Sequence, residues 1–283
     1  MMQPTNSVPA TKKCLQWSAE TDRGKIRTNN EDSFLCIQFD AREVRYLGKT
    51  GQEALDTTDY VFAVSDGMGG ALAGEYASRI AVEKITLLLP NSFRHSVTGF
   101  SIGFQDVLTE LFTEIHRALL YLGQSYAECA GMGTTLSLCW FTPTALYFAH
   151  IGDSRIYYLP AGGGVQIRQL THDDTHVGWL LRSGKITEQQ ARIHPWRHSL
   201  QRVLGSHPQS MDFQLGAVKY EPGDCFVLCT DGLTDGLFES QIVELLRHPN
   251  SEESQFAPAK RLVQASLMRS GRDNTTAVVV QVI

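Results

Sequence analysis

The sequence predicts an α+β fold in which sheets form the interior and helices lie outside. Apolar, β-branched runs of strand length occupy the first and last thirds of the chain. Two long stretches place apolar residues at helical spacing. The runs 134–141 and 145–151 are separated by only three residues, which predicts an antiparallel hairpin rather than a parallel βαβ unit.

The expected strands are short apolar runs bounded by turn residues. The run 59–65 stops at Asp66, and a strand at 225–229 follows the turn Glu221-Pro222-Gly223-Asp224. The remaining strands are predicted at 134–141, 145–151, 155–159 and 276–283.

Helices are predicted where apolar residues recur every three to four positions. The first spans 75–89 and ends at Pro90, and the second spans 104–122. Two shorter helices are expected at 240–247 and 258–269. Two segments fit this plan less well. Residues 40–58 are polar and indicate an extended hairpin or loop, and residues 171–208, rich in His, Arg and Gly, indicate a small helical flap.

Bulk composition limits the classes of protein that this chain can belong to. Its 283 residues permit one large domain or two small ones, and 42% hydrophobic against 19% charged residues allows a sizeable core. The net charge of −5 gives no electrostatic reason to expect nucleic acid or an anionic membrane as partner. No run approaches the ~20 apolar residues of a membrane span. Residues 1–13 are predicted to form a flexible polar tail ahead of a single domain at 14–283.

The six cysteines show no metal-binding spacing. Cys225 and Cys229 lie four residues apart in a predicted strand, about 13 Å at the usual rise, which is too far for a disulfide or a shared metal. We expect all six to be reduced core thiols in a cytoplasmic protein.

Short acidic segments at the boundaries of predicted strands carry the functional signal. Asp66-Gly67, Asp231-Gly232 and Asp273-Asn274 each adjoin an apolar run, and further segments of this kind are Asn30-Glu31-Asp32 and Gly152-Asp153. Each Asp-Gly pair alone is an ordinary turn, but together they place carboxylates where strands end. Converging carboxylates need a cation, and oxygen ligands suit Mg²⁺ or Mn²⁺. This pattern predicts a multi-metal hydrolytic site.

Such a site would act on phosphate esters. Two divalent ions can hold a water between them and lower its pKa, so that the resulting hydroxide attacks phosphorus without a protein nucleophile. A guanidinium nearby would hold the phosphate, and Arg27 is the candidate; the alternative is a solvated loop arginine. The histidines His172, His176, His194, His198 and His207 could suggest zinc, but their spacing matches no common ligand pattern.

At these residues the chain resembles the PPM-type, metal-dependent serine/threonine phosphatases (protein phosphatase type 2C family) in their bacterial form. The resemblance runs from about Gln16 to the end of the chain, and order and spacing both agree. The matching motifs are Thr21-Asp22-Arg23-Gly24 with Arg27, Asn30-Glu31-Asp32-Ser33, Asp66-Gly67-Met68-Gly69-Gly70, Gly131-Met132-Gly133-Thr134-Thr135, Gly152-Asp153-Ser154-Arg155, Thr230-Asp231-Gly232 and Asp273-Asn274-Thr275-Thr276.

The resemblance implies a four-layer α-β-β-α sandwich, two antiparallel sheets flanked by helix pairs, with a flap at about 171–208. It implies two Mn²⁺ or Mg²⁺ ions and a third, weaker one. The implied ligands are Asp66, which bridges the two ions, Gly67 through its carbonyl, Asp231 and Asp273 at the second ion, Glu31 and Asp32 partly through water, and Asp153 at the third ion. Arg27, Asp32 and Asp66 would be the catalytic residues, with Arg27 binding the substrate phosphate.

Some positions depart from the family pattern. Met68 stands where many eukaryotic members carry a proposed general-acid histidine, and Ala71 and Asp174 each replace a residue common in bacterial relatives. Residues 40–58 are longer than in minimal members.

The expected function is hydrolysis of phosphoserine and phosphothreonine in proteins, opposing a bacterial serine/threonine kinase, by a monomer with no nucleic-acid or membrane partner. Two alternatives are a switch phosphatase dedicated to one partner and a non-catalytic phosphoprotein-binding relative. The second predicts lost acidic ligands, whereas all are present here.

Overall fold

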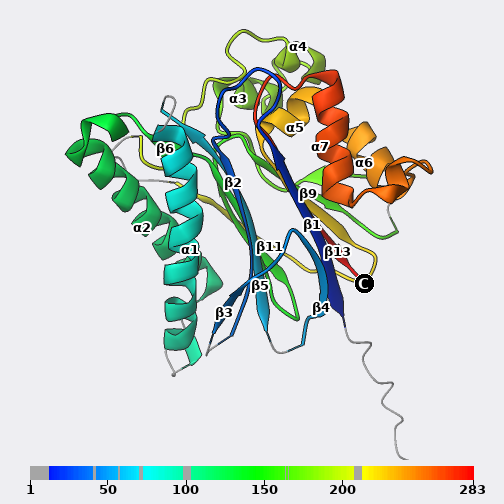
Figure 1. Cartoon of the computed structure of the whole chain (residues 1–283), viewed down its shortest axis with the longest axis horizontal. Helices are drawn as coiled ribbons and strands as arrows, with labels where there is room; N and C mark the ends of the chain where they lie inside the picture. The colour runs from blue at the N-terminus through cyan, green and yellow to red at the C-terminus, as the bar shows by residue number, and fades with distance from the viewer. Residues whose placement is uncertain are drawn as a thin grey trace, which may run out of the picture.

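The computed structural model describes residues 13–40, 43–56, 58–69, 73–97, 103–162, 164, 166–206 and 212–283. Two antiparallel sheets pack face to face, and helices cover both outer faces (Figure 1). The predicted four-layer α-β-β-α sandwich is therefore confirmed. The predicted tail lies outside the described residues except for Lys13.

Each sheet is a continuous antiparallel ladder. In the first sheet the strand order is β10 (Arg168–Gln169), β9 (Arg155–Leu159), β12 (Cys225–Cys229), β13 (Thr275–Val282), β1 (Cys14–Asp22) and β4 (Thr50–Ala54). In the second it is β11 (Gln214–Val218), β8 (Leu146–Ile151), β7 (Leu136–Phe141), β5 (Asp59–Met68), β2 (Asp32–Phe39) and β3 (Val44–Tyr46), with β6 (Gly133–Thr134) paired to β5.

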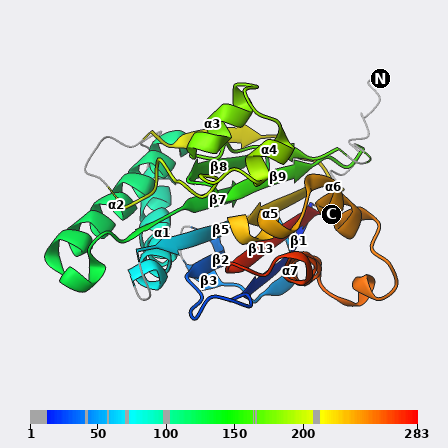
Figure 2. The ribbon, with the colours of Figure 1, turned by 90° about the horizontal axis from the view of Figure 1, so that it is seen from above.

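The helices bury one face each against a sheet. Helices α1 (Ala73–Val97) and α2 (Phe104–Ser125) cover the second sheet, followed by the 3₁₀ turn η1 (Ala127–Cys129). Helices α5 (Asp231–Gly236), α6 (Glu239–Arg247) and α7 (Pro258–Arg269), with the turn η2 (Glu253–Gln255), cover the first sheet. Helices α3 (His176–Arg182) and α4 (Glu188–Arg192) lie at one end of the sandwich, which Figure 2 shows from above.

Three apolar layers hold the sandwich together, and they explain the strand signals. The layer between the sheets is rich in aromatic rings, such as Phe62 and Phe141 with centroids 5.7 Å apart in an edge-on arrangement. Strand β5 has the helix layer on one side and the other sheet on the other. Its residues 60–64 are therefore fully buried, which explains an unbroken apolar run without alternation.

Three sequence expectations about secondary structure differ from the structure. The segment 40–58 forms β3 and β4, which extend the edges of both sheets through pairing with β2 and β1. Strand β5 continues beyond Asp66 to Met68 because Gly67 and Met68 pair with β6. Helix α1 continues through Pro90 to Val97, since a proline inside a helix removes one hydrogen bond and bends the helix without always ending it.

No helix in the described part of the chain is long and apolar enough to cross a membrane.

Candidate metal centre

The topology brings the predicted acidic residues to the same end of both sheets. Asp32 opens β2 and is directly paired with Asp66 near the end of the antiparallel strand β5. In the first sheet, the pairing of Cys229 with Arg155 and Ala277 puts the end of β12 beside the starts of β9 and β13. The carboxylates that follow or precede these strand ends, Asp153, Asp231 and Asp273, therefore lie at that same end.

Threonine hydroxyls fix the backbone at Asp66. The Asp66 N–H donates to Thr135 Oγ1 at 3.0 Å, and Thr134 Oγ1 donates to the Asp66 carbonyl at 2.8 Å. Thr135 Oγ1 also lies 2.7 Å from Ser154 Oγ, next to Asp153. One pair of threonines thus connects the position of Asp66 to the turn that carries Asp153.

Two hydroxyls hold one oxygen of Asp32 and leave the other without a partner. Thr230 Oγ1 and Thr276 Oγ1 each donate to Asp32 Oδ2 at 2.7 Å. Among the described residues, neither Asp32 Oδ1 nor Asp231 Oδ1 finds a hydrogen-bond partner, although both atoms are buried. Buried carboxylate oxygens without donors are costly, and a cation would satisfy them.

The electrostatics of the carboxylates are those of a crowded acidic site. Burial, and then repulsion from Asp231 and Asp273, raise the pKa of Asp32 to about 7 against two stabilising threonine hydrogen bonds. Burial, followed by the charges of Asp32 and Asp231, raises the pKa of Asp66 well above its usual value. Burial and Asp231 do the same for the pKa of Asp153. A divalent cation would reverse this repulsion.

Glu31 and Gly67 meet at the beginning of α1. The Gly67 N–H donates to the Glu31 carbonyl at 3.1 Å. A Cβ added to Gly74 would lie 2.9 Å from both the Glu31 carboxyl carbon and the Gly67 carbonyl oxygen. The Glu31 carboxyl group and the Gly67 carbonyl oxygen therefore lie close to the same point beside Gly74. Because Gly74 has no side chain, there is space between them.

Other side chains occupy part of the acidic set. Arg27 Nη2 donates to Asp273 Oδ2 at 2.8 Å, and His198 Nδ1 lies 3.1 Å from Asp231 Oδ2. Within the described ranges, no three His, Cys, Asp or Glu side chains form a ready-made coordination shell. The carboxylates lie in one region and repel one another electrostatically. Asp231 and Asp273, however, each contact a basic side chain.

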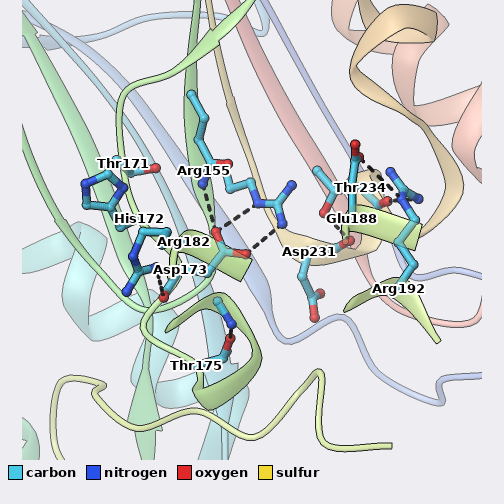
Figure 3. A network of polar contacts seen from close by, with 12 residues as sticks. Arg155, Thr171, His172, Asp173, Thr175, Arg182, Glu188, Arg192, Asp231 and Thr234 are labelled. Atoms are coloured by element: carbon cyan, nitrogen blue, oxygen red, sulfur yellow. Dashed lines mark hydrogen bonds and ion pairs between the residues drawn. The ribbon is translucent and has the colours of Figure 1, made fainter. Parts of the chain in front are cut away.

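A cavity of about 330 Å³ opens beside Asp153 and Asp231, under the flap helices. Its wall carries the pair Arg155–Asp173, in which Arg155 Nε and Nη2 donate to the two carboxylate oxygens at 2.9 and 2.6 Å (Figure 3). Arg155 Nη1 also donates to Tyr157 Oη at 2.8 Å. This two-point contact fixes the first residues of the flap against β9.

Asp174 connects the flap to the turn that carries Asp153. Its Oδ2 accepts from the Gly152 N–H at 3.0 Å, and its Oδ1 lies 2.9 Å from Arg202 Nη2. The carboxylate is buried and faces these partners. The departure at Asp174 therefore acts in the structure as a tether. Met68 is exposed at the end of β5, and Ala71 lies outside the described residues.

Two residues at the site were not assigned a role from sequence. Asn274 accepts the Glu31 N–H at Oδ1 and donates from Nδ2 to the carbonyls of Arg23 and Asn29, so it ties the loop before β2 to the start of β13. Asn274 belongs to the sequence motif around Asp273, and its place in that motif could have indicated its role. No local sequence pattern indicates a role for His198, because its contact with Asp231 joins the flap to α5 across 33 residues.

The buried carboxyl group of Asp32, whose Oδ1 has no hydrogen-bond partner among the described residues, leads to a prediction about pH and stability. In chelator-treated protein, we expect stability to fall as pH rises from about 4 to about 7. Over that range the unfolded chain has ionised Asp32 while the folded chain still holds its proton. Ionisation of Asp32 should lower the free energy of unfolding by at most roughly 4 kcal/mol over this pH range. Urea unfolding at several pH values should show a shallower decline for Asp32→Asn, and equal slopes for both proteins would contradict the raised pKa.

The chain is similar to known phosphatases over nearly its whole length. The family model described as "Protein phosphatase 2C" matches residues 49–267. The serine/threonine protein phosphatase PstP of Mycobacterium tuberculosis is 33% identical over 272 residues, which are 95% of this chain and 45% of that relative. The serine/threonine phosphatase stp of Listeria monocytogenes is 29% identical over 92% of this chain and 93% of that protein. The chain thus spans less than half of the length of the Mycobacterium relative.

The chain is also similar to solved structures of serine/threonine phosphatases. The crystal structure of the Mycobacterium tuberculosis phosphatase PstP/Ppp aligns with a TM-score of 0.74 at 32% identity, over 95% of this chain and 98% of that one. The catalytic domain of PstP in complex with two manganese ions aligns with a TM-score of 0.72 at 31% identity, over 96% of this chain and 99% of that one.

Proposed function

Because the chain belongs to the protein phosphatase 2C family, we propose that it hydrolyses phosphoserine and phosphothreonine in proteins with the help of Mn²⁺ or Mg²⁺. The observation that supports this most is the pair Asp32 and Asp66, held side by side on β2 and β5 with raised pKa values and an unpartnered buried oxygen on Asp32. Such a pair is costly unless a cation lies against it.

The residues fit a hard divalent cation through their oxygen-only donor set. We assign Asp66, Gly67, Asp231 and Asp273 as ligands of two core ions, Glu31 and Asp32 as adjacent groups, and Asp153 as a ligand of a third. When bound, these ions would supply an activated water and neutralise phosphoryl oxygens. The serine/threonine phosphatase PstP was crystallised with two manganese ions, which supports the choice of metal.

The chain's own residues would position the substrate. Arg27 is exposed and already binds a carboxylate oxygen of Asp273, so its guanidinium can hold a phosphate at the same place. Asp66 and Asp32 are held rigidly by threonines and so keep the acidic site in place during the reaction. The cavity beneath the flap would receive residues that flank the phosphorylated side chain, and Asp174 would keep the flap at a fixed distance from Asp153.

Residues 14–283 would act as one catalytic domain in a monomer, opposing a bacterial serine/threonine kinase in the cytoplasm. The alternative of a switch phosphatase with one dedicated partner uses the same site and differs only in its substrate.

Removal of metal provides the direct test. After treatment with chelator, activity on p-nitrophenyl phosphate and on a phosphothreonine peptide should fall at least about 100-fold, because the carboxylates alone repel a phosphate. Added Mn²⁺ should restore it, Mg²⁺ less so, and Ca²⁺ least. The melting temperature should rise with Mn²⁺ as binding to the folded state predicts. Full activity in chelator, or no shift in melting temperature with Mn²⁺, would rule out the proposal.

A further inference from the structure

Arg192, the last residue of α4 in the flap, binds the C-terminal end of α5. Its Nη1 donates to the Thr234 carbonyl at 2.9 Å, and its Nη2 donates to the Leu237 carbonyl at 2.8 Å. Its guanidinium lies 3.8 Å from the centroid of the Phe238 ring. Figure 3 shows Arg192 beside Thr234. A basic side chain commonly binds the last carbonyls of its own helix, but Arg192 binds carbonyls that lie 42 and 45 residues away.

The two carbonyls, and not a carboxylate, are the main partners of Arg192. Glu188 Oε1 lies 3.8 Å from Arg192 Nε, which is beyond hydrogen-bond distance, and the Glu188 side chain is 60% exposed. Burial lowers the pKa of Arg192 against the attraction of Glu188. The planar guanidinium holds the carbonyls with two separate donors, so it fixes the direction of the contact as well as its distance. Arg192 therefore forms a two-point attachment of α4 to α5.

The other basic contacts described between the flap and α5 involve acidic side chains at or near the predicted metal centre. His198 Nδ1 lies 3.1 Å from Asp231 Oδ2, and Arg197 Nη2 lies 3.8 Å from Asp235 Oδ2. If Asp231 binds a divalent cation as proposed, that cation competes with His198 for the carboxylate. The backbone carbonyls that Arg192 binds are not in the proposed ligand set. Metal binding would therefore leave the Arg192 attachment intact.

Helix α5 is itself fixed to α7. Ser266 Oγ of α7 donates to the Gly232 carbonyl at 2.8 Å. A Cβ added to Gly236 would lie 2.2 Å from the same Ser266 oxygen, so the two helices are in direct contact. Asp231 is the first residue of α5. Arg192 thus attaches the flap to a firmly packed helix that also carries a proposed metal ligand.

The attachment joins two walls of the cavity under the flap. Arg192 and Glu188 line this cavity from α4, and Asp231 and Thr234 line it from α5. The two hydrogen bonds of Arg192 keep these walls at a fixed separation.

We propose that Arg192 is a positioning residue that holds the cavity in the shape that receives the residues flanking the phosphorylated side chain. This inference rests on the proposed function, in which the cavity takes those residues. Arg192 acts through the position of α4 and does not touch the phosphate. Its effect should therefore be large for peptide substrates, which reach into the cavity, and small for aryl phosphates, which do not.

The variant Arg192→Met tests the proposal with the Mn²⁺-loaded protein. For a phosphothreonine peptide, kcat/KM should fall about 10-fold, chiefly through a higher KM. For p-nitrophenyl phosphate, which has no flanking residues, kcat/KM should fall at most about 2-fold. Hydrogen exchange of the backbone amides in 176–198 should be faster in the variant than in the wild type, because α4 is released from α5.

Lys185→Met is the matched control, because it removes one positive charge from the same flap. Lys185 is exposed and lies 4.0 Å from the centroid of the Trp179 ring, within the flap. Its replacement should change neither the kinetics nor the exchange rates.

Arg192→Lys keeps the charge but carries a single ammonium group, which cannot span both carbonyl oxygens. It should show the same selective loss for the peptide, smaller than that of Arg192→Met. If Arg192→Met does not fold, this variant decides. Wild-type kinetics and exchange in Arg192→Lys would show that the charge suffices, and would overturn the two-point attachment.

Three further results would overturn the proposal. Equal losses on the peptide and on p-nitrophenyl phosphate would mean that Arg192 acts at the reacting phosphate. A loss confined to peptides with acidic residues beside the phosphothreonine would mean that Arg192 binds the substrate directly. Unchanged exchange of the flap amides in Arg192→Met would reject the attachment, whether or not the protein is active. A wild-type protein that acts on neither substrate would instead reject the proposed function, while the exchange rates still test the attachment.

Discussion

Replacing Asp66 by asparagine is expected to reduce phosphatase activity by about 10³-fold without loss of the fold. A change of roughly 4 kcal/mol in the barrier corresponds to this factor, and the loss of the negative charge that Asp66 would supply to the proposed metal centre would account for it. Burial and four neighbouring carboxylates raise the pKa of Asp66 in the metal-free chain, so a neutral amide of the same shape removes repulsion. Metal-free Asp66→Asn should therefore melt at or above the temperature of the metal-free wild type.

The same strand offers a matched control. Asp59 begins β5 at the opposite end, is buried, and has a pKa raised by burial to about 6. Its carboxylate accepts a hydrogen bond from Trp140 Nε1 at 2.8 Å, which an amide oxygen can also accept. Asp59→Asn should keep its activity and its Mn²⁺-dependent shift in melting temperature, whereas Asp66→Asn should lose both. Comparable losses in the two variants would mean that strand packing, and not the metal centre, is what Asp66 supplies.

The parts of the fold that sequence predicted best are those with strong local signals. The ranges expected for β9, β12 and α7 match the structure because each is an apolar run or periodic stretch bounded by turn residues or proline. The pair Asp231-Gly232 follows the end of β12 as expected, but Asp66-Gly67 does not end β5, because Gly67 and Met68 go on to pair with β6.

The features that the sequence alone did not predict depend on contacts between residues that are far apart in the chain. Strands β3 and β4 are short edge strands with a partner on one side only, so residues 40–58 lacked a buried-strand pattern and were expected to form an extended hairpin or loop. Asp32 and Thr230 are 198 residues apart, yet their hydrogen bond decides which carboxylate oxygen remains free. The same holds for Asp174, whose neighbours Gly152 and Arg202 determine that it tethers the flap. Such contacts have no local pattern.

Breaking the Arg155–Asp173 pair is expected to produce the largest loss of stability among changes near the cavity. Burial alone would raise the pKa of Asp173, but the Arg155 guanidinium more than offsets this and lowers it. Removing one partner of a buried pair leaves the other charge unpaired, which costs about 3–5 kcal/mol. The two side chains retain 22% and 16% exposure, so we expect Asp173→Ala to cost about 3 kcal/mol, or a decrease of roughly 6–10 °C in melting temperature.

Two comparisons separate this effect from a general weakening of the flap. Glu188 lies 3.8 Å from Arg192 at the same cavity and is 60% exposed, so Glu188→Ala should cost well under 1 kcal/mol. The double variant Arg155→Met, Asp173→Leu removes both charges and should recover much of the loss, because the penalty of Asp173→Ala comes from the stranded guanidinium and not from a missing attraction. A double variant as unstable as Asp173→Ala would instead mean that the loss comes from missing contacts of the two side chains, among them the Arg155–Tyr157 hydrogen bond within β9, and not from an unpaired guanidinium.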